Sequence, residues 1–428
     1  MRASLLLSSL YLAAGIQARA APNRRRAEPA PVFRTQADTA NLIDQKYIVK
    51  MKRGASVTAV DDALASINSR SQQTFNTSPA FQGFTAKLND DELEALRDHP
   101  DVDFIEQDAE VHPLANFTTQ ADAKWALSRV SSRVVNTTDY TYDDSGGQGV
   151  CVWMFDTGIW VDHPDFEGRA VFGQDFSHDG GINNDLNGHG TWTAGLVGSK
   201  TYGVAKKASL IAVKVVDLGG RGNISDFVEG MEYVQGQIQW RQRDCPKGYV
   251  INISLAYPVS PIMDAAAAAL VEGGVFLAVA AGNNGAVVNN SPGTVPTVCT
   301  VGSTNSEDVV SWFSNYGPLV DIFAPGENVL GPTIRKSSTW PDAPEEAGDG
   351  TSASAPLVAG LAAYLLSLEG KRDPAALCDR IKELGTKNIL NKMPGNGTTN
   401  NVIFNGNPAA GGNSSFAFSA KAGHVRSF

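Results

Sequence analysis

Residues 149–155 read Gly-Val-Cys-Val-Trp-Met-Phe, and Asp156 follows them directly. The run is apolar at almost every position, which is typical of a strand covered on both faces. Three similar runs follow along the chain, at 209–216, 249–255 and 274–280. Helical patterns lie between them, at 190–199, 225–240 and 262–272. This alternation predicts an α/β domain with a central parallel sheet.

A different pattern precedes this domain, between about residues 43 and 113. Strand-like and helical runs alternate there, at 47–50, 57–67, 81–88, 90–98 and 102–105. Together they predict a small α+β unit of about 70 residues. The stretch 21–40 ahead of it is rich in Pro, Ala and Arg and predicts a flexible leader.

The composition restricts the function. The chain has 428 residues, 42% of them apolar and 19% charged, which is enough for a sizeable folded core. Its formal net charge is −10. Such a chain offers no general basic surface for phosphate backbones, so we expect no nucleic acid among its partners.

The N-terminus has the form of a secretory signal peptide. Met1-Arg2 is followed by an apolar run from Leu5 to Ile16 and then by Ala18-Arg19-Ala20. Because the run is too short to span a membrane, we predict a signal peptide over 1–20 that is cleaved after Ala20. No later apolar stretch reaches about 18 residues, so we expect a secreted, extracellular protein with no membrane span. Residues 408–428, rich in Gly, Asn, Ala and Ser, predict a disordered tail.

Secretion would place the cysteines in an oxidising compartment, where disulfides form. Cys151, Cys245, Cys299 and Cys378 are far apart, which predicts two disulfides and not a zinc site. Three pairings are possible, and spacing does not choose between them. Sequons suitable for glycans are Asn76, Asn136, Asn223, Asn396 and Asn413.

Three polar residues beside glycines stand where predicted strands end or helices begin. Asp156 lies in FDTGI, His189 in NGHGTWTAG and Ser352 in DGTSASAP, where a later helix begins. Each alone is more often structural, as a helix cap or a turn residue. Because sites in α/β sheets gather where strands end and helices begin, the three together indicate one catalytic site.

Seven segments, these three included, resemble the subtilisin superfamily of serine proteases and, within it, the proteinase K branch. In chain order they are GQGVCVWMFDTGIWVDHPDF, NGHGTWTAGLVGS, VINISLAYP, FLAVAAGNNG, SPGTVPTVCTVGSTN, FSNYGPLVDIFAPG and GTSASAPLVAGLAAYL. The resemblance implies a three-layer, subtilisin-like catalytic domain over 118–407. Ahead of it, 43–113 resembles the inhibitory propeptide of such proteases, which implies a ferredoxin-like unit within a propeptide over 21–117.

The resemblance also implies roles for these residues. Ser352 would be the nucleophile, His189 the base that takes its proton, and Asp156 the carboxylate that stabilises the imidazolium. The Asn283 side-chain amide and the Ser352 backbone N–H would form the oxyanion hole. The implied protein is a secreted, monomeric serine endopeptidase that hydrolyses proteins or peptides through an acyl-enzyme. Its propeptide would be an intramolecular inhibitor that the enzyme itself cleaves off before Thr118.

Two segments are expected to bind extended substrate as an added β-strand. They are Gly220-Arg221-Gly222 and Ser254-Leu255-Ala256. The first specificity pocket would lie between the second segment and Ala280 to Gly282. These walls carry no charged side chain, so we predict apolar residues before the cut. Departures from the family pattern bear on this pocket: Trp192 for a second histidine, Ala353 for a methionine, and Ala256-Tyr257 for two glycines.

The resemblance pairs Cys151 with Cys245 and Cys299 with Cys378. It further implies a structural Ca²⁺ bound by the Asp321 carboxylate and by the backbone carbonyls of Pro296 and Val298, oxygen ligands that suit this ion. The alternative is that Asp321 forms a salt bridge or caps an element. Arg133 occupies a ligand position of a second calcium site, which we expect to be lost. We expect no cofactor for catalysis.

The sequence also bears on other functions. The same departures from the family pattern fit a catalytically weak subtilase-like binding or surface protein. An α/β-hydrolase esterase is disfavoured because that fold orders its triad Ser, Asp, His and carries G-x-S-x-G. A dinucleotide-binding enzyme is disfavoured because GGRGN at 219–223 does not supply G-x-G-x-x-G.

Overall fold

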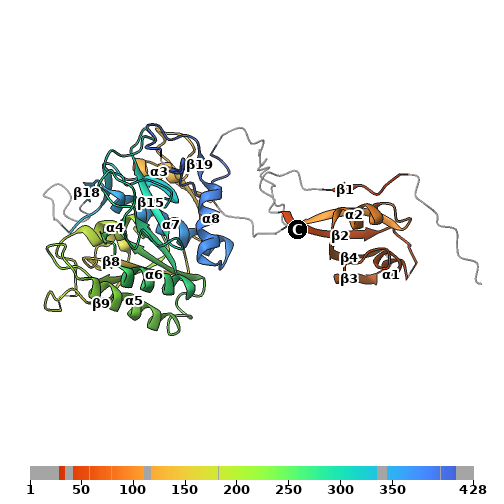
Figure 1. Ribbon diagram of the computed structural model, residues 1–428, viewed down its shortest axis with the longest axis horizontal. Helices are drawn as coiled ribbons and strands as arrows, with labels where there is room; N and C mark the ends of the chain where they lie inside the picture. Colours follow the sequence, from red (N-terminus) through yellow and green to blue (C-terminus); the bar gives the residue numbers. More distant parts are fainter. Residues whose placement is uncertain are drawn as a thin grey trace, which may run out of the picture. The chain divides into compact units, whose positions relative to one another are not determined.

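The chain divides into two units, Met1–Pro113 and Leu114–Phe428, which are described one by one (Figure 1). The computed structural model describes residues 28–33, 42–56, 58–78, 80–109, 117–181, 183–334, 345–395 and 397–410. The predicted signal peptide lies outside these ranges, as does the predicted tail beyond residue 410.

The N-terminal unit is a sheet packed against two helices. Along the chain its elements are β1 (Val32–Phe33), β2 (Leu42–Met51), α1 (Ala59–Leu64), β3 (Ser71–Ser78), β4 (Phe81–Lys87), α2 (Asp90–Arg97) and β5 (Val102–Ala109). The strand order is β1-β5-β2-β4-β3. Apart from the short β1, this is the βαββαβ arrangement of a ferredoxin-like unit, as predicted. Its core includes the fully buried Met51, Phe84 and Leu96.

The C-terminal unit is built on a 9-stranded sheet in the order β19-β20-β16-β15-β13-β11-β8-β10-β9. These strands are β8 (Val150–Asp156), β9 (Ala170–Asp175), β10 (Ser209–Lys214), β11 (Gly248–Ile253), β13 (Phe276–Ala280), β15 (Cys299–Thr304), β16 (Ile322–Pro325), β19 (Thr386–Lys387) and β20 (Asn401–Val402). All neighbours pair in parallel except β19 and β20. The predicted parallel sheet is therefore confirmed.

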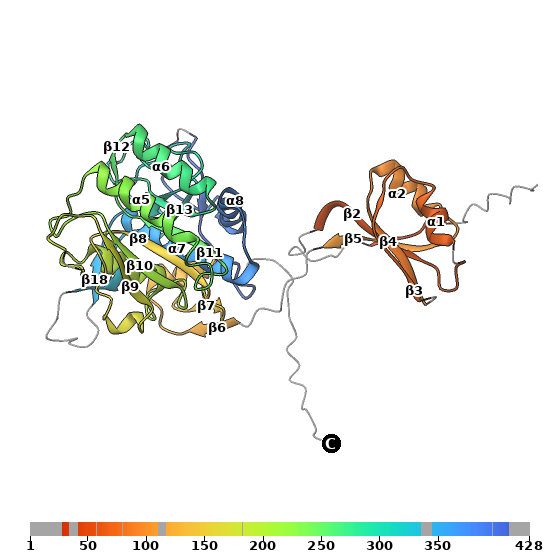
Figure 2. The ribbon, with the colours of Figure 1, turned by 90° about the horizontal axis from the view of Figure 1, so that it is seen from below.

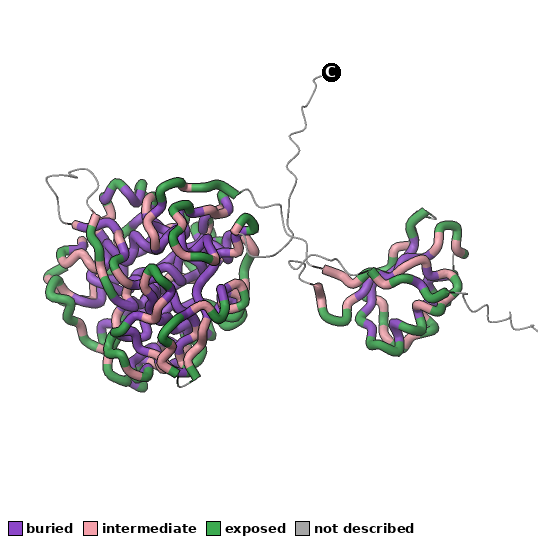
Figure 3. Tube along the Cα trace, turned by 90° about the horizontal axis from the view of Figure 1, so that it is seen from above, coloured by how far each residue is buried: buried purple, intermediate pink, exposed green. Residues whose placement is uncertain are grey.

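Helices cover both faces of this sheet. They are α3 (Trp125–Val130), α4 (His189–Gly198), α5 (Ile224–Ile238), α6 (Pro261–Glu272), α7 (Thr351–Glu369) and α8 (Pro374–Leu384), with a 3-10 turn at Pro164–Phe166. In Figures 1 and 2, α5 and α6 lie along one face, and α4 and α7 along the other. Side chains of β8 alternate between two core clusters, Val152 and Met154 toward α7, and Trp153 and Phe155 toward α5. The result is the expected three-layer domain, with a buried interior visible in Figure 3.

Helix α7 forms the centre of one of these layers. By length and composition it could cross a membrane, but 89% of its apolar 18-residue segment is buried inside the unit. It is therefore a core helix of this fold.

Small two-stranded sheets surround the central one. They pair β6 (Phe117–Gln120) with β7 (Tyr140–Asp143), β12 (Tyr257–Pro258) with β14 (Asn290–Ser291), and β17 (Val329–Pro332) with β18 (Glu345–Gly348). Two disulfides join Cys151 to Cys245 and Cys299 to Cys378, the pairing that the resemblance implied.

The chain order reverses beside β8, because β10 lies on one side of it and β11 on the other. In sheets of this kind, sites form where such a reversal leaves a crevice at the carboxyl ends of the strands. Asp156 is the last residue of β8, His189 the first of α4, and Ser352 lies in the first turn of α7.

Candidate active site

Asp156 anchors the site from the end of β8. Its side chain is fully buried, and both carboxylate oxygens accept hydrogen bonds. Oδ1 accepts from the backbone N–H of Thr157 at 2.8 Å and lies 2.7 Å from Nδ1 of His189, while Oδ2 accepts from the Thr193 hydroxyl at 3.1 Å. A buried charge is tolerated when it is paired and hydrogen-bonded in this way.

His189 begins α4 beside this carboxylate. Its Nδ1 faces Asp156, which leaves Nε2 for chemistry. Gly190 allows the close approach, because a Cβ there would lie 2.0 Å from the carbonyl oxygen of Gly158. Burial disfavours the imidazolium, but the charge and hydrogen bond of Asp156, with the charge of Asp185, outweigh it and raise the pKa of His189 above its ordinary value. The imidazole is therefore prepared to accept a proton.

Asp185 organises the turn that leads into α4. This buried carboxylate accepts hydrogen bonds from the hydroxyls of Thr157 and Thr191 and from the N–H of Gly188, at 2.7 to 2.9 Å. The Thr157 hydroxyl in turn accepts from the N–H of Gly190. Neither Asp185 nor Thr193 was predicted from the sequence, although an aspartate four residues before His189 was a signal that could have been used.

Ser352 lies in the first turn of α7, the helix that packs against α4. Its hydroxyl donates to the carbonyl of Ser254 at 2.9 Å, and the Ser254 hydroxyl donates to the carbonyl of Ser352 at 3.0 Å. In the described part of the chain no hydrogen bond joins Ser352 to His189. For base catalysis the Ser352 hydroxyl must therefore turn its hydrogen bond from the Ser254 carbonyl to Nε2 of His189.

Two donors border the same space next to Ser352. The Asn283 amide is oriented by its oxygen, which accepts from the Thr351 N–H at 2.9 Å and from the Thr351 hydroxyl at 2.8 Å. A Cβ on Gly350 would lie 3.1 Å from Nδ2 of Asn283 and 3.5 Å from the N of Ser352. Glycine is required here, because its φ is +137° and a side chain would crowd both donors. Both donors can act on an oxyanion formed at Ser352.

The two expected substrate segments lie on exposed edges. Gly220 and Arg221 are exposed on a turn that Asp217 closes, accepting from the Arg221 N–H at 2.8 Å. Ala256 is exposed at the other edge. Tyr257, next to Ala256, brings its hydroxyl close to Gly222 of the other segment: a Cβ on Gly222 would lie 3.2 Å from the hydroxyl oxygen. Burial, with the charges of nearby carboxylates, raises the pKa of this phenol to about 12, so it is uncharged near neutral pH.

The remaining pocket residues are more enclosed. Ser254, Ala280 and Gly282 are buried, and Leu255 is half-buried against the core on the α5 side.

Trp192 and Ala353 are buried. Trp192 is only 7% exposed, and its indole N–H donates to the carbonyl of Val329 in β17 at 3.1 Å. Its ring centroid lies 5.9 Å from that of His189. Ala353 is fully buried in the core on the α7 side. A separate pocket of about 230 Å³ borders the histidine, lined by His189, Trp192, Asn187, Gly188 and 346–349.

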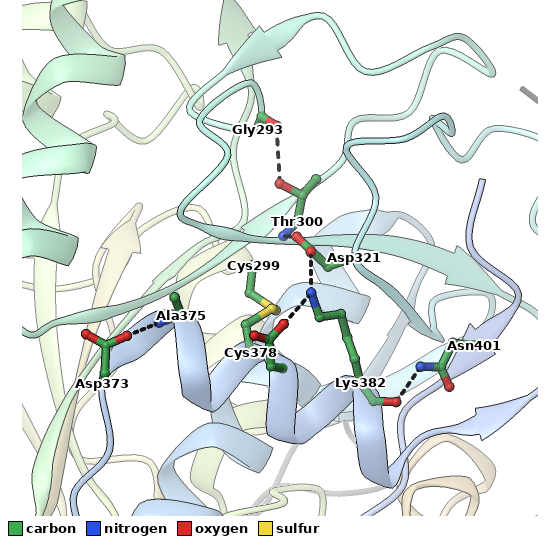
Figure 4. The surroundings of a disulfide bond; sticks show 10 residues. Gly293, Cys299, Thr300, Asp321, Asp373, Ala375, Cys378, Lys382 and Asn401 are labelled. Carbon is green, nitrogen blue, oxygen red and sulfur yellow. Dashed lines mark hydrogen bonds and ion pairs between the residues drawn. A yellow bond between two sulfur atoms is a disulfide. The ribbon is translucent and has the colours of Figure 1, made fainter. Parts of the chain in front are cut away.

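Asp321 does not have the environment expected of a calcium ligand. Its Oδ2 accepts from the N–H of Thr300 at 2.9 Å, and its Oδ1 lies 3.3 Å from Nζ of Lys382 (Figure 4). Burial is the main cause that raises the pKa of this carboxyl, against the lowering effects of Thr300 and Lys382. The nearby sulfurs of Cys299 and Cys378 are joined in a disulfide and are not metal ligands. With an ammonium group facing Oδ1, the Asp321 carboxylate therefore does not fit a calcium ion as it stands, and the salt-bridge alternative is the one observed.

The fold and this arrangement define a class of protein. A histidine paired with a buried aspartate, beside a serine at a helix N-terminus with two oriented donors, is the apparatus of a serine hydrolase. The chain belongs to the subtilase family, whose model, described as "Subtilase family", matches residues 147–401. A second model, "Peptidase inhibitor I9", matches residues 46–113.

Two named proteins and one solved structure are similar to this chain. The chain is 48% identical over 402 residues to "Cuticle-degrading protease" of Metarhizium anisopliae, covering 94% of this chain and 99% of that protein. It is 41% identical to "Proteinase R" of Parengyodontium album, covering 95% and 99%. A solved structure titled "Crystal structure of a cold adapted subtilisin-like serine proteinase" has a TM-score of 0.60 and 33% identity, covering 66% of this chain and 98% of that one. The protein is thus a subtilisin-like serine endopeptidase of the proteinase K branch, made as a zymogen with its own inhibitory propeptide.

Proposed function

We propose that Ser352 is the nucleophile, His189 the general base and Asp156 the residue that orients it. The observation that carries this proposal is the 2.7 Å contact of His189 Nδ1 with a fully buried carboxylate. The serine oxygen bonds to the scissile carbonyl carbon while its proton moves to His189. The C–N bond then breaks as His189 returns that proton to the leaving amine. Water hydrolyses the acyl-enzyme by the same steps.

Asn283 and the N–H of Ser352 stabilise the negative oxygen formed in each step. Support for this comes from the Thr351 contacts, which turn the Asn283 oxygen away and leave its amide to donate. A donor oriented in advance lowers the barrier because it needs no reorganisation during the reaction.

Single and double variants test these roles. The propeptide of each variant is removed in trans by a protease that is inhibited before the assay. Ser352→Ala and His189→Ala should each lower kcat on a peptide anilide by about 10⁶-fold, a magnitude established in subtilisin, a member of this family. The double variant should be no worse than either single one, because the residues act as a unit. Retention of a tenth of the activity by Ser352→Ala would contradict the proposal.

The enzyme also cleaves its own propeptide, with Phe117 before the cut and Thr118 after it. In support, this bond lies at the start of β6, whose pairing with β7 would hold the new N-terminus in place. Ser352→Ala, expressed without other proteases, should accumulate with residues 21–117 attached, whereas the wild-type chain begins at Thr118. Correct trimming of Ser352→Ala would contradict self-processing.

Substrate binds as a strand between Gly220-Arg221-Gly222 and Ser254-Leu255-Ala256. Apolar residues are preferred before the cut, because the pocket walls at 254–256 and 280–282 carry no charge. Ala353 is packed in the interior and gives no reason to expect an impaired catalytic site. Trp192 is buried as well, with its ring beside that of His189.

The precursor is exported by the signal peptide and works outside the cell as a monomer. The two disulfides support an oxidising destination. Of the sequons, Asn136 and Asn223 are exposed, and the Asn223 amide donates to Asp226 at 3.2 Å. The side chain of Asn76, and Asn396 and Asn413 as a whole, lie outside the described residues. Subtilases generally bind structural calcium, but we do not extend the proposal to an ion held by Asp321, Pro296 and Val298.

A further inference from the structure

Asp321 is positioned by the strand next to it. It directly precedes β16, and its backbone N–H donates to the carbonyl of Thr300 in β15 at 2.9 Å. The Thr300 N–H returns a hydrogen bond to Oδ2. The carboxylate is therefore held in one orientation, with Oδ1 left for a cation.

Lys382 supplies that cation from α8. Its Nζ lies 3.3 Å from Oδ1 of Asp321 and 2.8 Å from Oδ1 of Asp379, which lies three residues before it on the same helix. An ammonium group has three donors, so it can serve both carboxylates at once. The lysine side chain is about one-third exposed, which leaves its remaining donor for water.

The neighbouring disulfide places this lysine. Cys378 and Lys382 are four residues apart in α8 and therefore lie on one face of the helix. Cys378 is bonded to Cys299, the residue before Thr300, so the disulfide holds that face against the strand that orients Asp321 (Figure 4). The carbonyl of Lys382 also accepts a hydrogen bond from the Asn401 amide at 2.7 Å. The backbone position from which Lys382 reaches the carboxylate is thus fixed.

We propose that Lys382 is a built-in replacement for the structural calcium ion expected at Asp321. A divalent cation bound at Oδ1 would lie beside an ammonium group of the same sign, and the two would repel. A tethered lysine cannot dissociate, so this corner of the fold keeps its cation at any calcium concentration. The proposal is independent of the catalytic roles, since it concerns stability and metal binding only.

Thermal unfolding in excess chelator and in millimolar CaCl₂ tests whether Lys382 takes the place of calcium. The mature enzyme is first inactivated with a serine-directed reagent to prevent autolysis. The wild-type Tm should differ by less than about 1 °C between the two conditions. Lys382→Met keeps the apolar stem but frees both carboxylates, so its Tm should fall in chelator and recover by about 5 °C in calcium. Lys382→Arg should remain insensitive to calcium.

Two controls make the result specific. Lys371→Met removes an exposed lysine that forms no ion pair in the described part of the chain, and it should not create calcium dependence. Lys382→Met combined with Asp321→Asn should lose the calcium response. The proposal would be overturned by a calcium-dependent wild-type Tm that Asp321→Asn abolishes. The proposal would equally be overturned by a Lys382→Met variant that is as stable as the wild type and whose Tm does not change with calcium.

Discussion

Asp156 and Asp321 both lie at ends of strands in the same sheet, but their surroundings differ. Asp156 ends β8 and is fully buried, whereas Asp321 precedes β16 with its side chain about one-quarter exposed. Each accepts a hydrogen bond from a backbone N–H, and each faces one cationic or basic group. The group facing Asp156 is an imidazole, which we propose gains and loses a proton during the reaction, whereas the group facing Asp321 is an ammonium that stays charged. Under the proposed roles, the group that faces each carboxylate, more than the carboxylate itself, separates a catalytic from a stabilising function.

The strongest test of this comparison removes one charge at a time. Asp156→Asn should lower kcat by about 10⁴-fold, the loss seen when a triad aspartate is replaced in another serine protease, because the amide favours the wrong histidine tautomer. Asp321→Asn should leave kcat within about twofold and lower the Tm instead, because it leaves Lys382 without one of its two anions. Activity assays give kcat and thermal unfolding gives the Tm of both variants. A large loss of kcat in Asp321→Asn with an unchanged Tm would contradict the division of roles.

A smaller loss is expected from the oxyanion side of the site. Asn283→Ala should lower kcat by about 10²- to 10³-fold with little change in KM, a magnitude borrowed from subtilisin itself. The matched control is Asn284→Ala, an exposed neighbour whose backbone, not its side chain, is bonded to Asn315. If KM rises and kcat holds, Asn283 binds substrate in its ground state and does not stabilise the oxyanion.

The pH dependence follows from the groups around His189. The base acts only when neutral, so kcat/KM falls as the pH drops below its pKa. That pKa is raised, which places the acid limb above the ordinary value of 6.5. Asp185→Asn removes one of the negative charges that raise it, so the limb should move to lower pH. The exposed Asp162→Asn serves as control and should leave the limb in place. A shift toward higher pH in Asp185→Asn would contradict this electrostatic assignment.

The smallest effect is expected at the specificity pocket. By the family resemblance, the Ala256 methyl stands at a position where a glycine is expected, and the Tyr257 hydroxyl lies close to Gly222, where a Cβ would be 3.2 Å from it. One methyl group in a pocket changes discrimination by about 10- to 200-fold at most. Leu, Met and Ala should therefore compete well with Phe and Tyr before the cut, and Ala256→Gly should shift the profile toward the larger aromatics. Profiling with a mixed peptide library checks this, and dominant cleavage after a charged residue would show that the pocket is wrongly assigned.

Most of the fold could be predicted from the sequence because its central strands are buried on both faces. Continuous apolar runs at β8, β10, β11 and β13 left little ambiguity, and Gly-flanked polar residues marked the ends where a site forms. Strand β3 was missed because its sequence, SQQTFNTS, is polar and lies at the edge of its sheet. A strand with few apolar residues gives no period to detect.

Contacts between distant segments could not be predicted in the same way. Lys382 meets Asp321 only because a disulfide brings α8 to β15, and 61 residues separate the two in the chain. Trp192 raised doubts about the pocket as a sequence feature, yet its indole is bonded to β17 in the interior. In both cases the tertiary neighbour, and not the residue type, determines the role.

Labelling of the mature enzyme with a fluorophosphonate tests the assignment of the nucleophile most directly. Peptide mapping by mass spectrometry should find a single adduct on Ser352, which is absent in Ser352→Ala and formed far more slowly in His189→Ala. Ser354→Ala, which removes a buried hydroxyl two residues away, should label like the wild type. An adduct on another serine, or undiminished labelling of Ser352→Ala, would contradict the assignment.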